Sequence, residues 1–171
     1  HDSPPPAAAA ATELCAPGLA YLGSLCVLGA APVEPMKFIY HLVPEESWQE
    51  AKTNEQPYLP PTYAQDGFIH ATAEPELLLP VANHFYTDVP GQYLCLRIDT
   101  ELLKAEVKYE PAAPVGDKPA KPGEQVEAGG EASPPPTLFP HIYGPIGVAA
   151  VVAELVVERS ATGAFTAIAG L

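Results

Sequence analysis

Basic residues are scarce in this sequence of 171 residues, which has 8 lysines and arginines against 21 aspartates and glutamates, for a formal net charge of −13. The eight basic residues are spread along the chain and form no cluster. A nucleic-acid-binding face needs clustered positive charge to displace the counterions of the phosphate backbone. An anionic membrane surface likewise attracts basic rather than acidic segments. We therefore expect a soluble protein with neither a nucleic-acid nor a membrane partner.

Cysteine is also rare. Cys15, Cys26 and Cys95 are the only three, and no two of them form a Cys-x-x-Cys pair. An odd number with this spacing is typical neither of a disulfide framework nor of a structural zinc site. The pattern favours a reducing compartment, and hence a cytoplasmic location. An organelle is the alternative if the N-terminal arm is the remnant of a processed segment.

Proline, by contrast, is abundant, with 22 residues, and much of it gathers at 1–35 and 111–136. A secretory signal or a transit peptide carries basic residues, but the first segment has no lysine or arginine. Its apolar stretch is too short to cross a bilayer. We predict a flexible arm at 1–35 and a single domain at 36–171. The alternative is that the arm binds a protein partner, as in a subunit of a larger assembly.

The segment 111–136 consists mainly of proline, glycine, alanine and acidic residues, with few large apolar side chains. Such a segment cannot bury enough apolar surface to offset the entropy lost on ordering. We predict a long loop, or a lid over a binding site.

Hydrophobic patterning predicts an α+β domain with a small mixed or antiparallel sheet and two main helices. The expected strands are 37–43, 67–71, 93–98, 107–109, 147–158 and 164–168. The segment 147–158 is a run of valine and alanine, so we expect it to be a buried strand. The expected helices are 44–52 and 74–86, with one further helical turn at 99–103. Pro80 is compatible with the second helix only within its first turns.

Histidines interrupt two of these strands. His41 follows Tyr40, and strand alternation places the two side chains on opposite faces. His41 is either a structural histidine at a strand end or a donor to a ligand hydroxyl or carbonyl. His70 and Thr72 share one face by the same alternation, which is typical of a ligand-facing pair. Thr72 is alternatively the N-cap of the following helix.

A third histidine lies in Phe139–Pro145, a segment with two prolines and a glycine. We predict a rigid loop here, from which His141 and Tyr143 project on the same side. Three imidazoles are a possible zinc ligand set, but no His/Glu pair has helical ligand spacing, so we expect no metal. No serine or cysteine stands in a nucleophile-elbow context.

In this order the segments resemble the domain-of-unknown-function 952 family. The resemblance extends from Lys37 to Ile168 and is carried by five motifs: Ile39-Tyr40-His41, Trp48, Gly67–Thr72, Val81–Tyr86 and Phe139–Pro145.

The resemblance implies a split sheet like that of the ADP-ribosyltransferases, nearest the RNA 2′-phosphotransferase branch, with NAD as cofactor. It implies that His41 holds a ribose and that His70 is the second histidine, beside Thr72. The glutamate of many transferases has no clear match, and Tyr143 or His141 would take its place. The expected catalytic residues are His41, His70 and His141. The expected contacts to NAD or a related small-molecule nucleotide are Tyr40, His41, His70, Thr72 and Tyr143. The alternative is a non-catalytic module.

Overall fold

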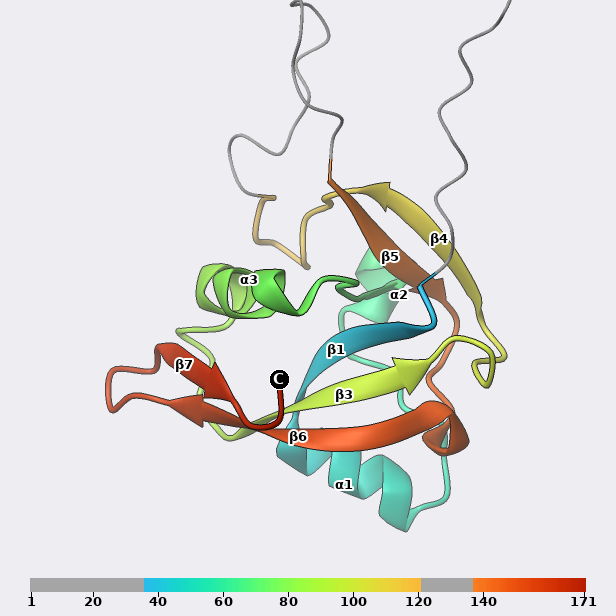
Figure 1. Ribbon diagram of the computed structural model, residues 1–171, viewed down its shortest axis with the longest axis horizontal. Helices are drawn as coiled ribbons and strands as arrows, with labels where there is room; N and C mark the ends of the chain where they lie inside the picture. Colours follow the sequence, from blue (N-terminus) through green and yellow to red (C-terminus); the bar gives the residue numbers. More distant parts are fainter. Residues whose placement is uncertain (1–35, 121–136) are drawn as a thin grey trace, which may run out of the picture. The chain divides into compact units, whose positions relative to one another are not determined.

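The computed structural model describes residues 36–120 and 137–171, which form two antiparallel sheets (Figure 1). The four-stranded sheet has the order β1-β3-β6-β7, with bounds Phe38–Pro44, Tyr93–Asp99, Val151–Arg159 and Phe165–Ile168. The three-stranded sheet has the order β2-β5-β4, with bounds Ile69–His70, Leu138–Tyr143 and Glu106–Pro111. The α-helices are α1 (Glu45–Thr53), α2 (Tyr63–Asp66) and α3 (Leu78–Phe85), and the 3-10 helices are Pro75–Leu77 and Val148–Ala150. The predicted α+β class with two main helices is confirmed.

The two sheets meet at one pair of residues. The backbones of Tyr40 in β1 and Thr72, just after β2, exchange two hydrogen bonds of 2.8 Å. No further β1–β2 ladder is present in the described residues, so β1 diverges from the three-stranded sheet beyond this point. This divergence places His41, the next residue of β1, at the opening between the sheets.

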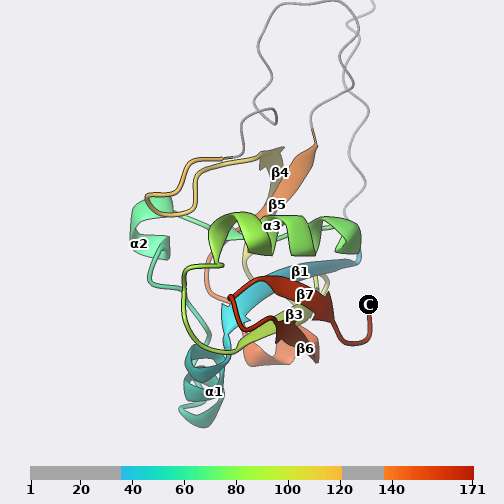
Figure 2. The ribbon, with the colours of Figure 1, turned by 90° about the vertical axis from the view of Figure 1, so that its left-hand side faces the viewer.

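Strand β1 is buried on both faces. Ile39 and Val43 pack on the side of α1, whose Trp48 is fully buried. Tyr40 and Leu42 pack on the other side, in the cluster that contains Leu78 and Ala82 of α3. Figures 1 and 2 show α1 and α3 on opposite faces of the four-stranded sheet. The core thus has two layers, with β1 and β3 between them.

The prediction of a rigid loop at Phe139–Pro145 is wrong, because Leu138–Tyr143 form β5, the central strand of the second sheet. Pro140 is tolerated there. Its carbonyl accepts the N–H of Ala71 at 3.0 Å. The N–H and C=O of a strand residue point to the same side of the strand. The N–H that proline lacks would therefore lie on the side of the two-residue strand β2 and not on the side of β4. The ladder with β4 therefore loses no hydrogen bond.

The prediction of a buried strand at 147–158 is also wrong in part. Val148–Ala150 form a 3-10 helix, and β6 begins at Val151. Val152 and Val156 are 48% and 54% exposed. Between them, Glu154 forms a 2.6 Å ion pair with Lys52 of α1, so the helix reaches β6 through polar side chains and leaves the two valines open. Glu154 and Glu158 have the same parity as Val152 and Val156 and so mark this exposed face, a signal that the description as a run of valine and alanine overlooked.

Smaller differences concern turns and caps. The residues after Asp99 form a hydrogen-bonded turn and not a helix, with the Asp99 carboxylate accepting the N–H of Glu101 at 3.0 Å. Pro80 is the third residue of α3 and so lies in its first turn, as predicted. The predicted arm at 1–35 and most of the predicted loop, residues 121–136, lie outside the described residues. No helix within the described ranges is long and apolar enough to cross a membrane.

Gly163 offers a test of how the β6–β7 turn is held against the chain before β3. Its φ is +85°, and an added Cβ would lie 2.5 Å from the carbonyl oxygen of Thr87. We expect Gly163→Ala to lower the free energy of unfolding by about 2 kcal/mol, from left-handed backbone strain together with this clash. Gly91→Ala is the matched control, because its φ is +103° with no atom near the added Cβ, and we expect about 1 kcal/mol. Equal losses in urea unfolding of the two variants would contradict the close approach.

Candidate functional site

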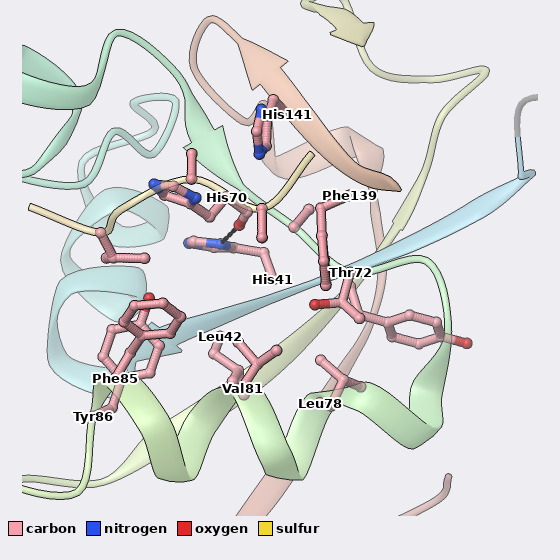
Figure 3. A pocket seen from close by; sticks show the side chains of 15 residues that line it. His41, Leu42, His70, Thr72, Leu78, Val81, Phe85, Tyr86, Phe139 and His141 are labelled. Carbon is pink, nitrogen blue, oxygen red and sulfur yellow. Dashed lines mark hydrogen bonds between the residues drawn. The ribbon is translucent and has the colours of Figure 1, made fainter. Parts of the chain in front are cut away.

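A recess opens where β1 diverges from the second sheet. It lies between these strands and α3, and Ala112, Ala113 and Val115 contribute to its wall after β4 (Figure 3). Five residues predicted from the sequence line it: Tyr40, His41, His70, Thr72 and His141. The three histidine segments, far apart in the chain, therefore converge on one place. The predicted loop or lid at 111–136 contributes to this wall through its described part.

His41 is fixed in one tautomer by its surroundings. Its Nδ1 lies 2.7 Å from the carbonyl oxygen of His70 and must donate, because a carbonyl only accepts (Figure 3). Its Nε2 is therefore a hydrogen-bond acceptor, and it is buried without a partner among the described residues. Burial lowers the pKa of His41 from 6.5 to about 4. The side chain is thus a neutral acceptor at neutral pH. The sequence suggested that His41 donates to a ligand, but its N–H donates to the carbonyl of His70 instead.

His70 is bound to a carboxylate that also holds the loop after β4. Its Nε2 lies 3.3 Å from Oδ2 of Asp66, and the backbone N–H of Gly116 donates to the same carboxylate at 3.1 Å. Burial is the main cause that lowers the pKa of His70, followed by the neighbouring His141. Asp66 thus connects a histidine of the recess to the chain that walls it.

Thr72 is buried and faces the recess. The alternative that it caps the following helix is wrong, since the 3-10 helix begins at Pro75 after Glu74 and has no side-chain cap. The hydroxyl of Thr72 is therefore available to the recess as a donor or an acceptor.

His141 belongs to a second fixed arrangement. Its Nδ1 lies 2.9 Å from Oε2 of Glu110, and the hydroxyl of Tyr143 donates to the same oxygen at 2.7 Å. These two bonds lower the pKa of Glu110, and the bond from Tyr143 has the larger effect. The ring of Phe68 stacks on the imidazole, with centroids 4.0 Å apart. Because the ionised Glu110 accepts, Nδ1 donates, and Nε2 of His141 is a second buried acceptor without a partner.

Tyr143 is the one predicted contact residue that does not line the recess. Its hydroxyl is engaged with Glu110, so it positions the carboxylate that orients His141. Sequence reasoning did not identify Glu110, Asp66 or Phe68. Asp66 and Phe68 flank Gly67 in the second histidine segment. Nothing in the sequence around Glu110 indicates a functional role, because Glu110 meets His141 only through the pairing of β4 with β5, two strands that are far apart in the chain.

A second recess adjoins the first at His41. The two share His41, Leu42, His70, Tyr86 and Val115, and we refer to them together as the cleft. The second part is lined further by Pro44, Tyr58, Pro60, Pro61, Thr62, Val89 and Tyr93. It therefore offers aromatic and proline surfaces without a charged side chain among the described residues.

The chemistry that this arrangement allows is acceptance of hydrogen bonds and protons. His41, His70 and His141 each have one ring nitrogen engaged by a protein oxygen. In the part of the chain that the structure describes, no group of three or more His, Cys, Asp or Glu side chains is arranged to hold a metal ion.

Comparisons with known proteins identify a family and a fold. Two crystal structures of the protein CC0527 from Caulobacter crescentus, the wild type and a double mutant, are similar to this chain, each with a TM-score of 0.53 and 23% and 22% identity. Each alignment covers 75% of this chain and 93% of the other. No curated protein matches. At this identity the structures show a shared fold.

The family itself is shown by sequence. The family model described as "Protein of unknown function (DUF952)" matches residues 42–154, more than half of the chain. This range contains the second and third histidine segments and begins one residue after His41. The resemblance of the motifs to this family is thereby confirmed, and the chain belongs to the DUF952 family.

Proposed function

We propose that the cleft binds NAD or an ADP-ribose-like nucleotide, with a ribose hydroxyl donating to Nε2 of His41. The observation that carries the proposal is the fixed state of this nitrogen, a neutral, buried acceptor without a partner. An unsatisfied buried polar atom costs about 1–3 kcal/mol. A ligand hydroxyl that reaches it recovers this cost, so the bond favours binding beyond its ordinary strength.

The opposite wall supports the same ligand class. Leu78, Val81, Phe85 and Tyr86 of α3 and the turn after it give the recess an apolar side, facing the histidines (Figure 3). Small-molecule sites in proteins are mostly apolar, with a few placed polar groups that orient the ligand. A ribose ring with hydroxyls on one face matches such a pair of walls.

The resemblance to the ADP-ribosyltransferase-like fold supports NAD among the nucleotides, because that fold places a histidine of its first strand on a ribose, and His41 has this position in β1. NAD supplies an ADP-ribosyl group through the bond to its nicotinamide, which leaves as a neutral molecule when that bond breaks. On the protein, Nε2 of His141 would hold a ribose hydroxyl of the bound NAD, and Glu110 would keep the ring in place through its other nitrogen. Nicotinamide release from NAD by the full chain measures this activity.

Binding is tested by calorimetry of the full chain with NAD, ADP-ribose and ADP. His41→Asn keeps an N–H near the position of Nδ1, for the carbonyl of His70, but has no atom at the position of Nε2. His41→Gln keeps an acceptor near Nε2. We expect His41→Asn to weaken binding by about tenfold and His41→Gln by about threefold or less. Absence of heat with all three ligands at millimolar concentration would refute the proposal.

A further inference from the structure

The fixed polar nitrogens of the cleft are acceptors. Nε2 of His41 and Nε2 of His141 come from strands of different sheets, and both side chains line the same recess. The two residues are only 5% and 2% exposed, and neither Nε2 has a partner within residues 36–120 and 137–171. The other nitrogen of each ring is committed as a donor, to the carbonyl of His70 and to Glu110. A ligand must therefore bring donors to both positions.

Charge around the cleft has one sign. No lysine or arginine of the described residues lines either part of it. The carboxylates of Asp66 and Glu110 stand directly behind His70 and His141. Lys118 is bonded to the carbonyl of Phe85 and to the carboxylate of Asp88, and so is neutralised where it lies. A phosphate inside the cleft would lie beside acceptor lone pairs, with two carboxylates behind the histidines and no positively charged side chain among the described lining residues, which makes its burial costly.

We propose that the group held in the cleft is a nucleoside, whose ribose hydroxyls donate to Nε2 of His41 and Nε2 of His141, and that every phosphate of the ligand stays outside. This inference rests on the proposed function and specifies which part of the nucleotide is recognised. Hydroxyl groups are neutral donors, so they satisfy both acceptors without placing a charge beside Glu110.

The second part of the cleft accounts for the base. It continues from His41 and is bordered by Tyr58, Tyr86 and Tyr93 together with Pro60 and Pro61. Flat apolar surfaces of this kind favour a planar ring over a charged group. The nucleoside thus extends from the histidines, where the sugar lies, toward the tyrosines and prolines, where the base lies.

The first test compares ligands by calorimetry on the full chain: adenosine, ADP, ADP-ribose and 2′,3′-dideoxyadenosine. We expect the dissociation constants of adenosine and ADP to agree within about threefold, because the phosphates make no contact in the cleft. We expect dideoxyadenosine, which lacks both hydroxyls, to bind at least about tenfold more weakly. If ADP or ADP-ribose binds while adenosine is more than about tenfold weaker, the inference is overturned and the proposed function stands. If none of the four binds, both fall.

The second test separates recognition by His141 from its structural role. His141→Asn keeps an N–H for Glu110 and removes Nε2, whereas His141→Gln keeps an acceptor near Nε2. We expect His141→Asn to weaken adenosine about tenfold and dideoxyadenosine less than about twofold, with His141→Gln close to the wild type for both. Equal losses for the two ligands in His141→Asn would show that the histidine acts on the fold of the cleft and not on the hydroxyls.

Discussion

Trp48→Ala is expected to lower the free energy of unfolding by about 4 kcal/mol, the largest effect of any single substitution considered for this chain. Trp48 is the one tryptophan of the sequence and is fully buried. No other residue of α1 is buried, so Trp48 carries the packing of this helix on the core. Its ring meets Tyr58 edge to face, with centroids 6.2 Å apart. Alanine would leave a cavity that the surrounding β-strands cannot close.

Urea unfolding followed by circular dichroism measures this loss, since the variant has no tryptophan fluorescence. Glu50→Ala is the matched control, because Glu50 lies on the exposed face of the same helix, and we expect a change below about 0.5 kcal/mol. A loss for Trp48→Ala of less than about 1.5 kcal/mol would mean that α1 is held by other contacts. Tyr58 also borders the second part of the cleft, so the substitution would weaken ligand binding as a secondary effect.

The elements that the sequence predicted well are those with a local signal. β1, α1 and β3 combine a clear apolar period with recognisable ends, and the structure has them within one or two residues of their predicted bounds. The histidine segments were predictable as a group for a related reason. Two of them place a polar ring in an apolar strand, and such a ring needs a partner or a ligand. The third was predicted from its two prolines and glycine as a rigid loop, although it forms β5. Their convergence on one recess is a property of the sheets, which no local pattern contains.

The features that the sequence did not reveal depend on pairing between distant segments. Pro140 is unfavourable in a central strand by the ordinary rule, and only the two-residue length of β2 makes it acceptable. Glu110 lies 31 residues before His141 and contacts it through the β4–β5 ladder. Glu110 therefore acts on the recess through the orientation of His141 and does not line the recess itself.

Acidification is expected to destabilise the protein strongly before most carboxylates are protonated. Burial lowers the pKa of His41 from 6.5 to about 4, so the unfolded chain binds a proton in this interval that the folded chain does not. Stability is complete above the unfolded pKa and is lost as the pH falls toward the folded one. Between about pH 7.5 and pH 4.5 we expect a loss of roughly 2 to 3 kcal/mol from His41. Burial lowers the pKa values of His70 and His141 too, so their contributions have the same sign.

Two carboxylates of the described residues contribute at lower pH than this interval. Hydrogen bonds lower the pKa of Glu110 below 4.5, as the Lys52 bond does that of Glu154, so their contributions to stability are lost only at lower pH. Urea unfolding at several pH values measures the effect, and His41→Asn is the informative variant because it has no ionisable group at this position. We expect its stability to fall by about 2 kcal/mol less than that of the wild type over the same interval. Equal pH dependence in both proteins would show that His41 is not held neutral by burial.

The same titration limits ligand binding from the other side. A protonated His41 carries a hydrogen on Nε2 and no longer accepts, so the proposed bond to a ribose hydroxyl fails when the folded protein takes up this proton. The folded pKa is about 4, and binding through His41 should therefore persist well below pH 6.5 as long as the chain is folded. As the pH falls, the free energy of unfolding therefore decreases first, and the affinity for the ligand decreases only at a lower pH. A protein that loses its ligand near pH 6.5 while its free energy of unfolding is unchanged would have a charged His41, and the assignment of this nitrogen as the ribose acceptor would be wrong.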